Sequence, residues 1–155
     1  MGEDQLTGLT PAPSPAGEGN RLPQLVAEEG ASLSSGSLRL YYLLPSPSGE
    51  GSGVRPVRPV GCIDLYNYDP LNRRCAVGIM VASEYRRQGY ALAMLRALET
   101  QQAASLHTLY ADIAATNTAS INLFRKAGYE ECGRFKEWLE LDSHFIDNIR
   151  MQKIL

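Results

Sequence analysis

The chain has 155 residues, of which 44% are hydrophobic and 21% are charged, and its formal net charge is −2 at pH 7. This length suits one hydrophobic core and is too short for two large domains, so we expect residues 1–155 to form a single domain. The small net charge and the lack of a basic stripe interleaved with aromatic residues give no support for nucleic-acid binding.

The sequence also shows no pattern of a membrane span or of a metal site. No run approaches the ~20 apolar residues of a membrane span, and the N-terminus lacks the regions of a signal peptide, so we expect a soluble cytoplasmic protein. Cys62, Cys75 and Cys132 are an odd number without metal-ligand spacing, which suits reduced thiols that fill the core. His107 and His144 have no partners in a metal or triad pattern, so no metal is expected.

Residues 1–36 form a short segment ahead of the expected core, residues 37–155. The prolines of residues 10–17 remove amide donors and restrict the residues before them, so this stretch is expected to be a loop or a tail. Apolar residues at helical spacing before Gly30 predict a short amphipathic helix over residues 21–30.

Three strands are predicted in the next part of the chain. Alternating β-favouring residues indicate strands at 37–44 and 60–68, and an apolar run indicates a third at 75–82. Residues 45–59 are rich in Pro, Ser and Gly, which predicts a mobile, exposed loop. Residues 69–72 predict a turn that closes a hairpin.

The remaining elements alternate between helix and strand. Apolar residues at helical spacing predict a first helix, and side-chain oxygens at Thr116 and Asn117 suit the start of a second. The order is therefore βββαβαββ, a mixed α/β (α+β) domain. The predicted elements are a helix at 89–105, a strand at 106–115, a helix from 117 to Gly128, and strands at 129–141 and 146–155.

The segment between the third strand and the first helix has the features of an anion-binding site. Gly89 lets a ligand approach the backbone, and the first-turn amides of a helix have no partners within the helix. The helix dipole favours negative charge, and Arg86 and Arg87 add full positive charges, so the site suits a pyrophosphate. The alternative is a solvated turn before an ordinary helix.

Two motifs resemble the GNAT N-acetyltransferases. Residues 86–91, Arg-Arg-Gln-Gly-Tyr-Ala, resemble the family's pyrophosphate loop, Q/R-x-x-G-x-G/A. Residues 117–129 resemble its N-x-x-S-x-x-L-Y/F-x-K-x-G-F/Y block, and the spacing leaves room for one helix and one strand. The resemblance covers about residues 37–155 and implies a GNAT fold, a mixed and mostly antiparallel sheet flanked by helices, here with a shortened N-terminal part.

The resemblance implies acetyl-CoA as cosubstrate. In the family, strand backbone groups hold the pantetheine arm and the thioester carbonyl, and the loop holds the pyrophosphate. Asn117 and Ser120 correspond to residues that contact the pantetheine arm, although Asn117 would also suit a helix cap. The cofactor-binding residues that follow from the resemblance are Ile79, Met80, Val81, Arg86, Arg87, Gln88, Gly89, Tyr90, Ala91, Asn117, Ser120, Phe124 and Lys126. For Tyr90, packing is the simpler role.

The catalytic groups are less evident. Many relatives have a tyrosine at the position of Phe124, and phenylalanine cannot donate a proton to the departing sulfur. Tyr129 could donate if it turns inward, but a tyrosine that begins a strand also suits the core. Asp64 lies in an apolar strand, and we expect it to share a face with Cys62, Tyr66 and Tyr68. It could accept the proton of the amine through water, or it could be an ordinary hydrogen-bonded strand aspartate.

The C-terminal part resembles two subgroups, the spermidine/spermine acetyltransferases and the acetyltransferases of ribosomal-protein N-termini. Acidic Glu28 and Glu29 could attract a polycation or simply solvate a helix face, and Trp138 could cover the core or the acceptor groove. We therefore expect acetyl transfer by direct attack in a ternary complex. The acceptor would be a primary amine: a polyamine, a protein N-terminus or a small amine. The resemblance also implies a homodimer or a higher homo-oligomer.

Two alternatives remain open at the level of sequence. One is a degenerate domain that binds or senses acyl-CoA without turnover, which Phe124 and the short N-terminal part favour. The other is a module that oligomerises through its strands.

Overall fold

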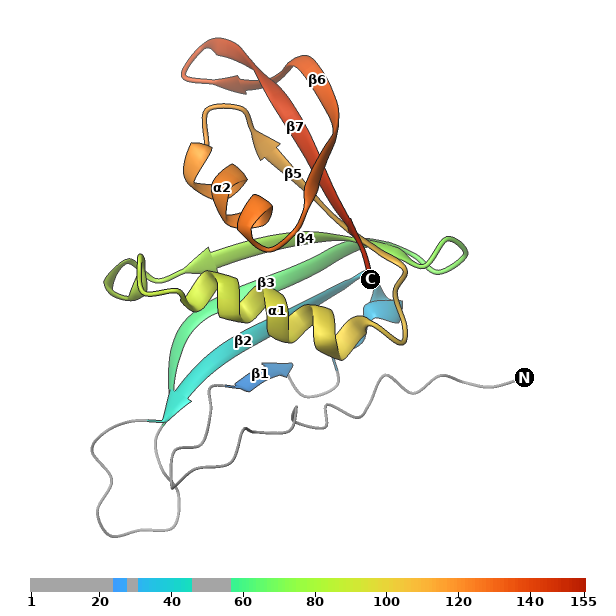
Figure 1. The fold of residues 1–155 in the computed structure, drawn as a ribbon, viewed down its shortest axis with the longest axis vertical. Coiled ribbons are helices and arrows are strands. Elements are labelled where there is room, and N and C mark those ends of the chain that lie inside the picture. Colours follow the sequence, from blue (N-terminus) through green and yellow to red (C-terminus); the bar gives the residue numbers. More distant parts are fainter. Residues whose placement is uncertain (1–23, 28–30, 46–56) are drawn as a thin grey trace, which may run out of the picture.

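The computed structural model describes residues 24–27, 31–45 and 57–155, and all statements below concern these residues. They form a seven-stranded sheet in the order β1-β2-β3-β4-β5-β7-β6, with two α-helices and two short 3₁₀ helices, η1 and η2 (Figure 1). Neighbouring strands are antiparallel except β4 and β5, which are parallel. The elements are β1 Gln24–Ala27, η1 Leu33–Ser35, β2 Ser37–Pro45, β3 Val57–Asp69, β4 Arg74–Val81, η2 Ser83–Tyr85, α1 Tyr90–Gln102, β5 Thr108–Ala114, α2 Thr118–Lys126, β6 Glu130–Leu141 and β7 His144–Ile154.

The period-two alternation of the strands divides the sheet into two faces. Alternate residues such as Leu40 on β2, Ile63 on β3 and Leu109 on β5 are fully buried in one core with the apolar residues of α1 and α2. Both helices lie on this face (Figure 1). We call the other side the open face; it carries Arg39, Asp64, Tyr66, Gly78, Tyr110, Asp112 and Arg150.

The sheet divides between its two parallel strands. β4 and β5 pair only over Arg74–Ala76 and Thr108–Tyr110, where Ala76 is opposite Tyr110. Beyond this point β4 continues beside β3, whereas β5 continues beside β7, and the two strands diverge (Figure 1). We call the resulting gap in the described sheet the β4–β5 opening.

The predicted order of strands and helices from residue 37 onward is confirmed. The turn after β3 is also confirmed, since the Asp69 carboxylate accepts hydrogen bonds from the backbone and side-chain amides of Asn72 at 3.0 and 2.8 Å. β6 and β7 are joined by Asp142 and Ser143, whose φ angles of 49° and 61° are those of a tight hairpin turn.

The helix predicted over residues 21–30 is wrong for its described part. Residues 24–27 form β1, which pairs with β2 from Gln24 opposite Leu43 to Ala27 opposite Leu40. Leu25 is buried and Val26 is exposed, which is strand alternation. The rest of the predicted helix, including Glu28 and Glu29, lies outside the described residues, as does the predicted tail before it.

Two smaller predictions need correction, and one of the two open alternatives for Trp138 is excluded. The loop predicted over 45–59 is shorter, because residue 45 ends β2 and residues 57–59 belong to β3, while residues 46–56 lie outside the described residues. Cys62 and Cys75 are buried as expected, but Cys132 is exposed; all three are free thiols. Trp138 is also exposed, and its ring packs on Phe135 with 5.2 Å between centroids, so it is not part of the core.

Candidate functional site

The segment from Ala82 to Gly89 joins the end of β4 to the start of α1 and has a defined shape. The Arg86 side chain donates from Nε to the carbonyl of Val81 at 3.0 Å, and Gln88 donates from Nε2 to the carbonyl of Glu84 at 2.9 Å. The first bond ties the loop back onto β4, and the second closes the loop on η2. The guanidinium of Arg86 keeps other N–H donors for a ligand.

The start of α1 fits an anionic ligand. Gly89 is the N-cap residue, with φ of 84°, and no described side chain caps the helix. The first-turn amides are therefore available to an outside acceptor. A Cβ built on Gly89 would meet no described atom within 4 Å, so the space beside this backbone is open. Arg87, with φ of 59°, is exposed beside it.

Tyr90 has the packing role that was one of its two expected roles. Its ring meets Tyr42 and Tyr85 edge-on, with centroid distances of 6.3 and 6.0 Å. These contacts join the first residue of α1 to β2 and to the loop. Ala91 follows it on α1 and is half-buried.

The three strand residues predicted to hold the pantetheine arm border the β4–β5 opening. Ile79, Met80 and Val81 lie beyond the last β4–β5 pair and still pair with β3 on their other side. One edge of this part of β4 therefore offers backbone groups that no strand of the described sheet uses. An extended amide-bearing chain can pair with such an edge.

The second motif forms α2 as predicted. Asn117 is its N-cap, and its Oδ1 accepts a hydrogen bond from the backbone N–H of Ser120 at 3.1 Å, which confirms the capping role. Whether Asn117 and Ser120 also contact a cofactor stays a prediction. Phe124 is buried in the core, and Lys126 is exposed in the last turn.

The two predicted catalytic residues lie on opposite faces of the sheet. Tyr129 is only 2% exposed, which confirms that it belongs to the core, and its hydroxyl finds no hydrogen-bond partner among the described residues. Burial, and then the charge of Glu99, raises the pKa of Tyr129, so the hydroxyl keeps its proton. Asp64 is on the open face, where the Arg39 guanidinium donates to both carboxylate oxygens.

One expected neighbour of Asp64 is on the other side of the sheet. Asn67 has φ of 51°, and the β3–β4 register shifts between Tyr66 and Asp69. This bulge turns Tyr68 toward the core, so it does not share a face with Asp64. Cys62 and Tyr66 do share that face, because they alternate with buried Ile63 and Leu65.

The open face carries a polar cluster that was not predicted from the sequence. Arg150 of β7 donates to both carboxylate oxygens of Asp112 on β5, at 2.7 Å each. Its guanidinium lies over the Tyr110 ring at 4.7 Å and near the Phe135 ring at 5.4 Å. Asp112 is a single carboxylate among the apolar residues of β5, as Asp64 is among its neighbours in β3. The pattern that identified Asp64 would therefore also have identified Asp112.

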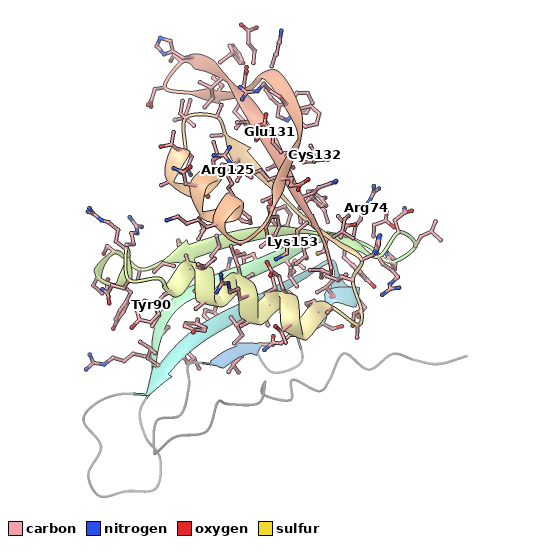
Figure 2. All side chains as sticks on the ribbon, viewed as in Figure 1. Arg74, Tyr90, Arg125, Glu131, Cys132 and Lys153 are labelled. Atoms are coloured by element: carbon pink, nitrogen blue, oxygen red, sulfur yellow. The ribbon has the colours of Figure 1, made fainter. Side chains whose placement is uncertain are left out.

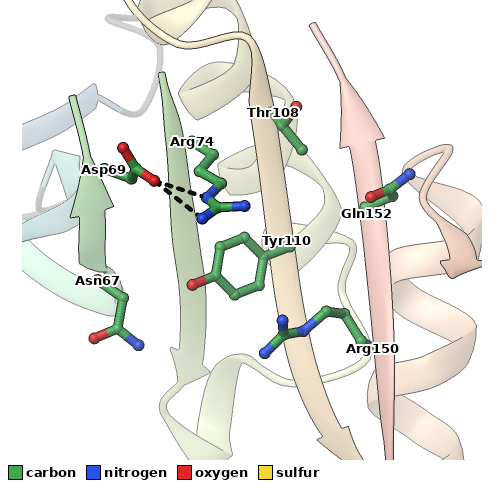
Figure 3. Close-up of a pocket in the computed structure, with 7 residues that line it drawn as sticks. All are labelled: Asn67, Asp69, Arg74, Thr108, Tyr110, Arg150 and Gln152. Carbon is green, nitrogen blue, oxygen red and sulfur yellow. Dashed lines mark hydrogen bonds and ion pairs between the residues drawn. The ribbon is translucent and has the colours of Figure 1, made fainter. Parts of the chain in front are cut away.

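A pocket of about 470 Å³ lies beside this cluster (Figure 3). We call it the open-face pocket. The residues that line it come from four strands: Asn67 and Asp69 from β3, Arg74 from β4, Thr108 and Tyr110 from β5, and Arg150 and Gln152 from β7. In Figure 2, Arg74 and Tyr90 lie on opposite sides of the view; Arg74 begins β4 and the Gly89 loop follows its other end, so the pocket and the loop are separate.

Two other features are absent from the described residues, a cluster of metal ligands and a membrane-spanning helix. Within the described residues, no group of three or more His, Cys, Asp and Glu side chains could hold a metal ion. None of the helices in this part of the chain is long and apolar enough to cross a membrane.

The fold and the site define an α/β domain with an anion-binding helix start beside a split between parallel strands. Residues 37–129 match the sequence profile of the Acetyltransferase (GNAT) family. Because this match covers more than half of the chain, the protein belongs to the GNAT acetyltransferase family. The resemblance based on the two motifs is therefore confirmed.

The comparisons also identify individual relatives. The chain is 26% identical over 94 residues to the spermidine N(1)-acetyltransferase of Vibrio cholerae serotype O1, which covers 59% of this chain and 54% of the relative. The chain thus spans about half the length of that curated relative.

Solved structures of a spermidine N-acetyltransferase from Vibrio cholerae have a similar fold. The complex with CoA and spermine superimposes with a TM-score of 0.65 at 20% identity, covering 78% of this chain and 67% of that one. A dodecameric form gives a TM-score of 0.64 at 21% identity, covering 77% and 65%. At this level of identity the similarity shows the fold, which is the GNAT fold predicted from the sequence.

Proposed function

We propose that the protein transfers the acetyl group of acetyl-CoA to a primary amine, by direct attack of the amine within a ternary complex. The observation that carries the proposal is the uncapped start of α1 at Gly89, next to the β4–β5 opening. The start of α1 offers a site for a pyrophosphate, and the free edge of β4 beside it offers a site for an extended chain. Family membership and relatives named for acetyl transfer support the same activity.

The residues present fit acetyl-CoA. The first-turn amides of α1, with Arg86, Arg87 and Gln88, would hold the pyrophosphate beside the open space at Gly89. The backbone of Ile79, Met80 and Val81 would hold the pantetheine arm along the free edge of β4. Asn117, Ser120, Phe124 and Lys126 are carried over from the family motif on the other side of the opening.

When bound, acetyl-CoA supplies an acetyl thioester. The amine nitrogen forms a bond to the acetyl carbon, the carbon–sulfur bond breaks, and the amine loses one proton while the sulfur leaves as a thiol. We propose Asp64 as the group that accepts the proton through water. The hydroxyl of Tyr129 lies buried on the opposite face of the sheet, so in this proposal the departing sulfur takes its proton from solvent. Because Phe124 cannot donate, positioning must supply much of the rate; well-oriented systems gain up to ~7–11 kcal/mol in this way.

The acceptor class is a primary amine, within which polyamines, peptide N-termini and small amines remain candidates. The relatives named above support an amine: one is a spermidine acetyltransferase, and one structure contains spermine. The dodecameric relative supports assembly of this chain into a homo-oligomer. Three free thiols fit the reducing cytoplasm, where we expect the protein to act.

The test is acetyl-CoA consumption by the purified protein, read as release of free thiol, against spermidine, spermine, N-terminal peptides, lysine peptides and small amines. Release with one or more of these amines, above the rate of hydrolysis without amine, is the expected result. Acetyl-CoA binding is measured in the same sample by calorimetry. Binding without release for any amine would overturn the enzymatic proposal.

That outcome would support the second candidate, a domain that binds acyl-CoA without turning it over. The observation in its favour is Phe124, which is buried and has no hydroxyl at the position where many relatives have a tyrosine. The Gly89 loop supports both candidates equally, so only turnover separates them.

A further inference from the structure

The β4–β5 opening has a closed end, and Gly78 lies there. The last β4–β5 pair joins Ala76 and Tyr110, and if the pairing continued, Gly78 would be opposite Asp112. An acetyl-CoA with its pyrophosphate at the start of α1 would run its pantetheine arm back along β4 from Val81. The thioester is at the other end of that arm, so it would lie near the closed end of the opening, beside Gly78.

Two side chains of β3 flank Gly78 on the open face. A Cβ built on Gly78 would meet Cε1 of Tyr66 at 3.6 Å and Cβ of Asp64, the proposed base, at 3.9 Å. Tyr66 is itself opposite Ala76, so its ring leans along β4 from Ala76 toward Gly78. Because Ala76 has a small side chain and Gly78 has none, the Tyr66 ring can lie over β4 at the closed end of the opening.

The Tyr66 hydroxyl is protonated and lies close to β5. Burial, and then the charge of Asp112, raises the pKa of Tyr66, so the phenol keeps its proton at neutral pH. Three other groups have smaller effects on this pKa: Tyr110, Cys75 and Arg150. Within the described ranges, no residue exchanges a hydrogen bond with the Tyr66 hydroxyl, so its proton is available to a ligand.

A hydroxyl at this place can stabilise the leaving group of acetyl transfer. Negative charge develops on the sulfur as the carbon–sulfur bond breaks, and a fixed hydrogen-bond donor stabilises such charge. Phe124 has no hydroxyl, and Tyr129 is buried on the core face. A thiol has an ordinary pKa of about 8.5 and a tyrosine one of about 10. Because the pKa of Tyr66 is raised further, its proton stays on the phenol oxygen and only a hydrogen bond reaches the sulfur.

We propose, resting on the acetyltransferase function above, that the Tyr66 hydroxyl donates a hydrogen bond to the sulfur of CoA as it leaves. The amine nitrogen forms its bond to the acetyl carbon, and the electron pair of the carbon–sulfur bond goes to the sulfur. The sulfur accepts the hydrogen bond from Tyr66 and then takes its proton from solvent, while Tyr66 keeps its own. A residue of β3 on the open face thus supplies the hydroxyl that Phe124 lacks.

The first experiment compares Tyr66→Phe, which removes only the hydroxyl, with the wild type. The single-turnover rate of thiol release, with the fastest amine of the panel above, should fall about tenfold, as one hydrogen bond to a charged group predicts. Acetyl-CoA affinity should not change. Tyr68→Phe is the matched control, because it removes a hydroxyl from the same strand on the core face, and it should keep the wild-type rate.

The second experiment measures the affinity for free CoA by calorimetry at about pH 7 and about pH 9.5. At the higher pH most of the CoA thiol is ionised, while Tyr66 still holds its proton. The wild type should then bind CoA about tenfold more tightly than Tyr66→Phe, and the two should be equal at the lower pH. Acetyl-CoA has no thiol, so it should bind both proteins equally at each pH. A merely structural role of Tyr66 would change the affinities for both ligands alike.

The outcomes separate this inference from the proposed function. A Tyr66→Phe protein that transfers acetyl at the wild-type rate, or that binds ionised CoA as tightly as the wild type, would overturn the inference and leave the acetyltransferase function standing. No release with any amine by the wild type, with acetyl-CoA bound, would overturn both.

Discussion

The Tyr129 ring meets the Phe124 ring edge-on, with 4.9 Å between their centroids and an angle of 85°. The same residues close α2, because the Tyr129 N–H donates to the Phe124 carbonyl and the Gly128 N–H to the Arg125 carbonyl, each at 3.0 Å. Gly128 has φ of 91°, as this helix ending requires. Phe124 thus anchors the end of the second family motif, a structural role that needs no hydroxyl.

A half-buried ion pair lies beside this helix end. Lys153 lies between α1 and α2 (Figure 2), where its Nζ donates to Glu99 Oε2 and to the Ala127 carbonyl, each at 2.6 Å. Glu99 is only 12% exposed, and its Oε1 has no partner in the described structure. Lys153 therefore links α1, through Glu99, and the end of α2, through Ala127, to β7.

Lys153→Met should lower the free energy of unfolding by about 2–3 kcal/mol, because it leaves the Glu99 charge unpaired. Urea unfolding would measure this loss. The double variant Glu99→Gln/Lys153→Met removes the charge as well and should recover part of the stability. If Lys153→Met were as stable as the wild type, the ion pair would not contribute to the stability of the fold.

Gly89→Val should weaken acetyl-CoA binding by at least about tenfold in calorimetry, because the side chain enters the open space and the left-handed backbone is strained. Gly36→Val is the matched control. Gly36 also has a left-handed φ, of 100°, with nothing within 4 Å, but it precedes β2 at the far end of the sheet. It should cost stability without changing affinity. The same affinity in both variants would refute the loop as pyrophosphate site.

The sequence predicts the parts of this fold that depend on local patterns. Apolar residues alternate in β2 and recur at helical spacing in α1, and in each element they mark the side that is buried. Both elements were predicted correctly. The Gly89 loop and the Asn117 cap depend on residues next to each other in the chain, so they too can be read from it.

What the sequence does not predict depends on distant partners. The strand β1 exists because β2 offers an edge to it, and four residues hold too little pattern to show this. The bulge at Asn67 turns the Tyr68 side chain to the core face, which strand alternation does not predict. Asp112 and Arg150 are 38 residues apart and meet only because β5 pairs with β7. This polar cluster is therefore visible only in the fold.

Asp64→Asn should lower kcat by about a hundredfold if Asp64 accepts the proton of the amine, and acetyl-CoA affinity should not change. The two values would come from thiol-release kinetics and calorimetry. Arg39→Met is the control, because it removes the partner of Asp64 and leaves the carboxylate in place. If Asp64→Asn has the wild-type kcat, Asp64 is a strand aspartate in an ion pair and has no role in catalysis.

Asn117→Ala should cost about 1 kcal/mol of stability, since the Ser120 N–H loses its acceptor. Asn117→Asp keeps an oxygen that can cap α2, so it separates the cap from a contact with the cofactor. We expect Asn117→Asp to unfold like the wild type in urea and to bind acetyl-CoA less tightly, because a carboxylate replaces an amide donor. Unchanged affinity in Asn117→Asp would reduce Asn117 to a cap.

Asp147 holds an irregular part of the β6–β7 hairpin. Its Oδ1 accepts the backbone N–H of Glu137 at 3.0 Å, and its Oδ2 accepts from Arg134 at 3.2 Å. Glu137 has φ of 48° where the β6–β7 register shifts, so Asp147 stabilises a bulge. The Glu137 N–H, and then Arg134, lowers the pKa of Asp147 below its ordinary value of 3.8.

A lowered pKa in the folded state means that the ionised carboxylate stabilises the fold above its ordinary pKa. This contribution is lost as the pH falls through the folded-state pKa. The wild type should therefore be more stable than Asp147→Asn at about pH 7, by a difference that stays constant down to about pH 5 and then shrinks toward about pH 2. Urea unfolding of both proteins across this range would measure it. A difference that stayed constant with pH would mean that the bulge depends on the shape of the side chain and not on its charge.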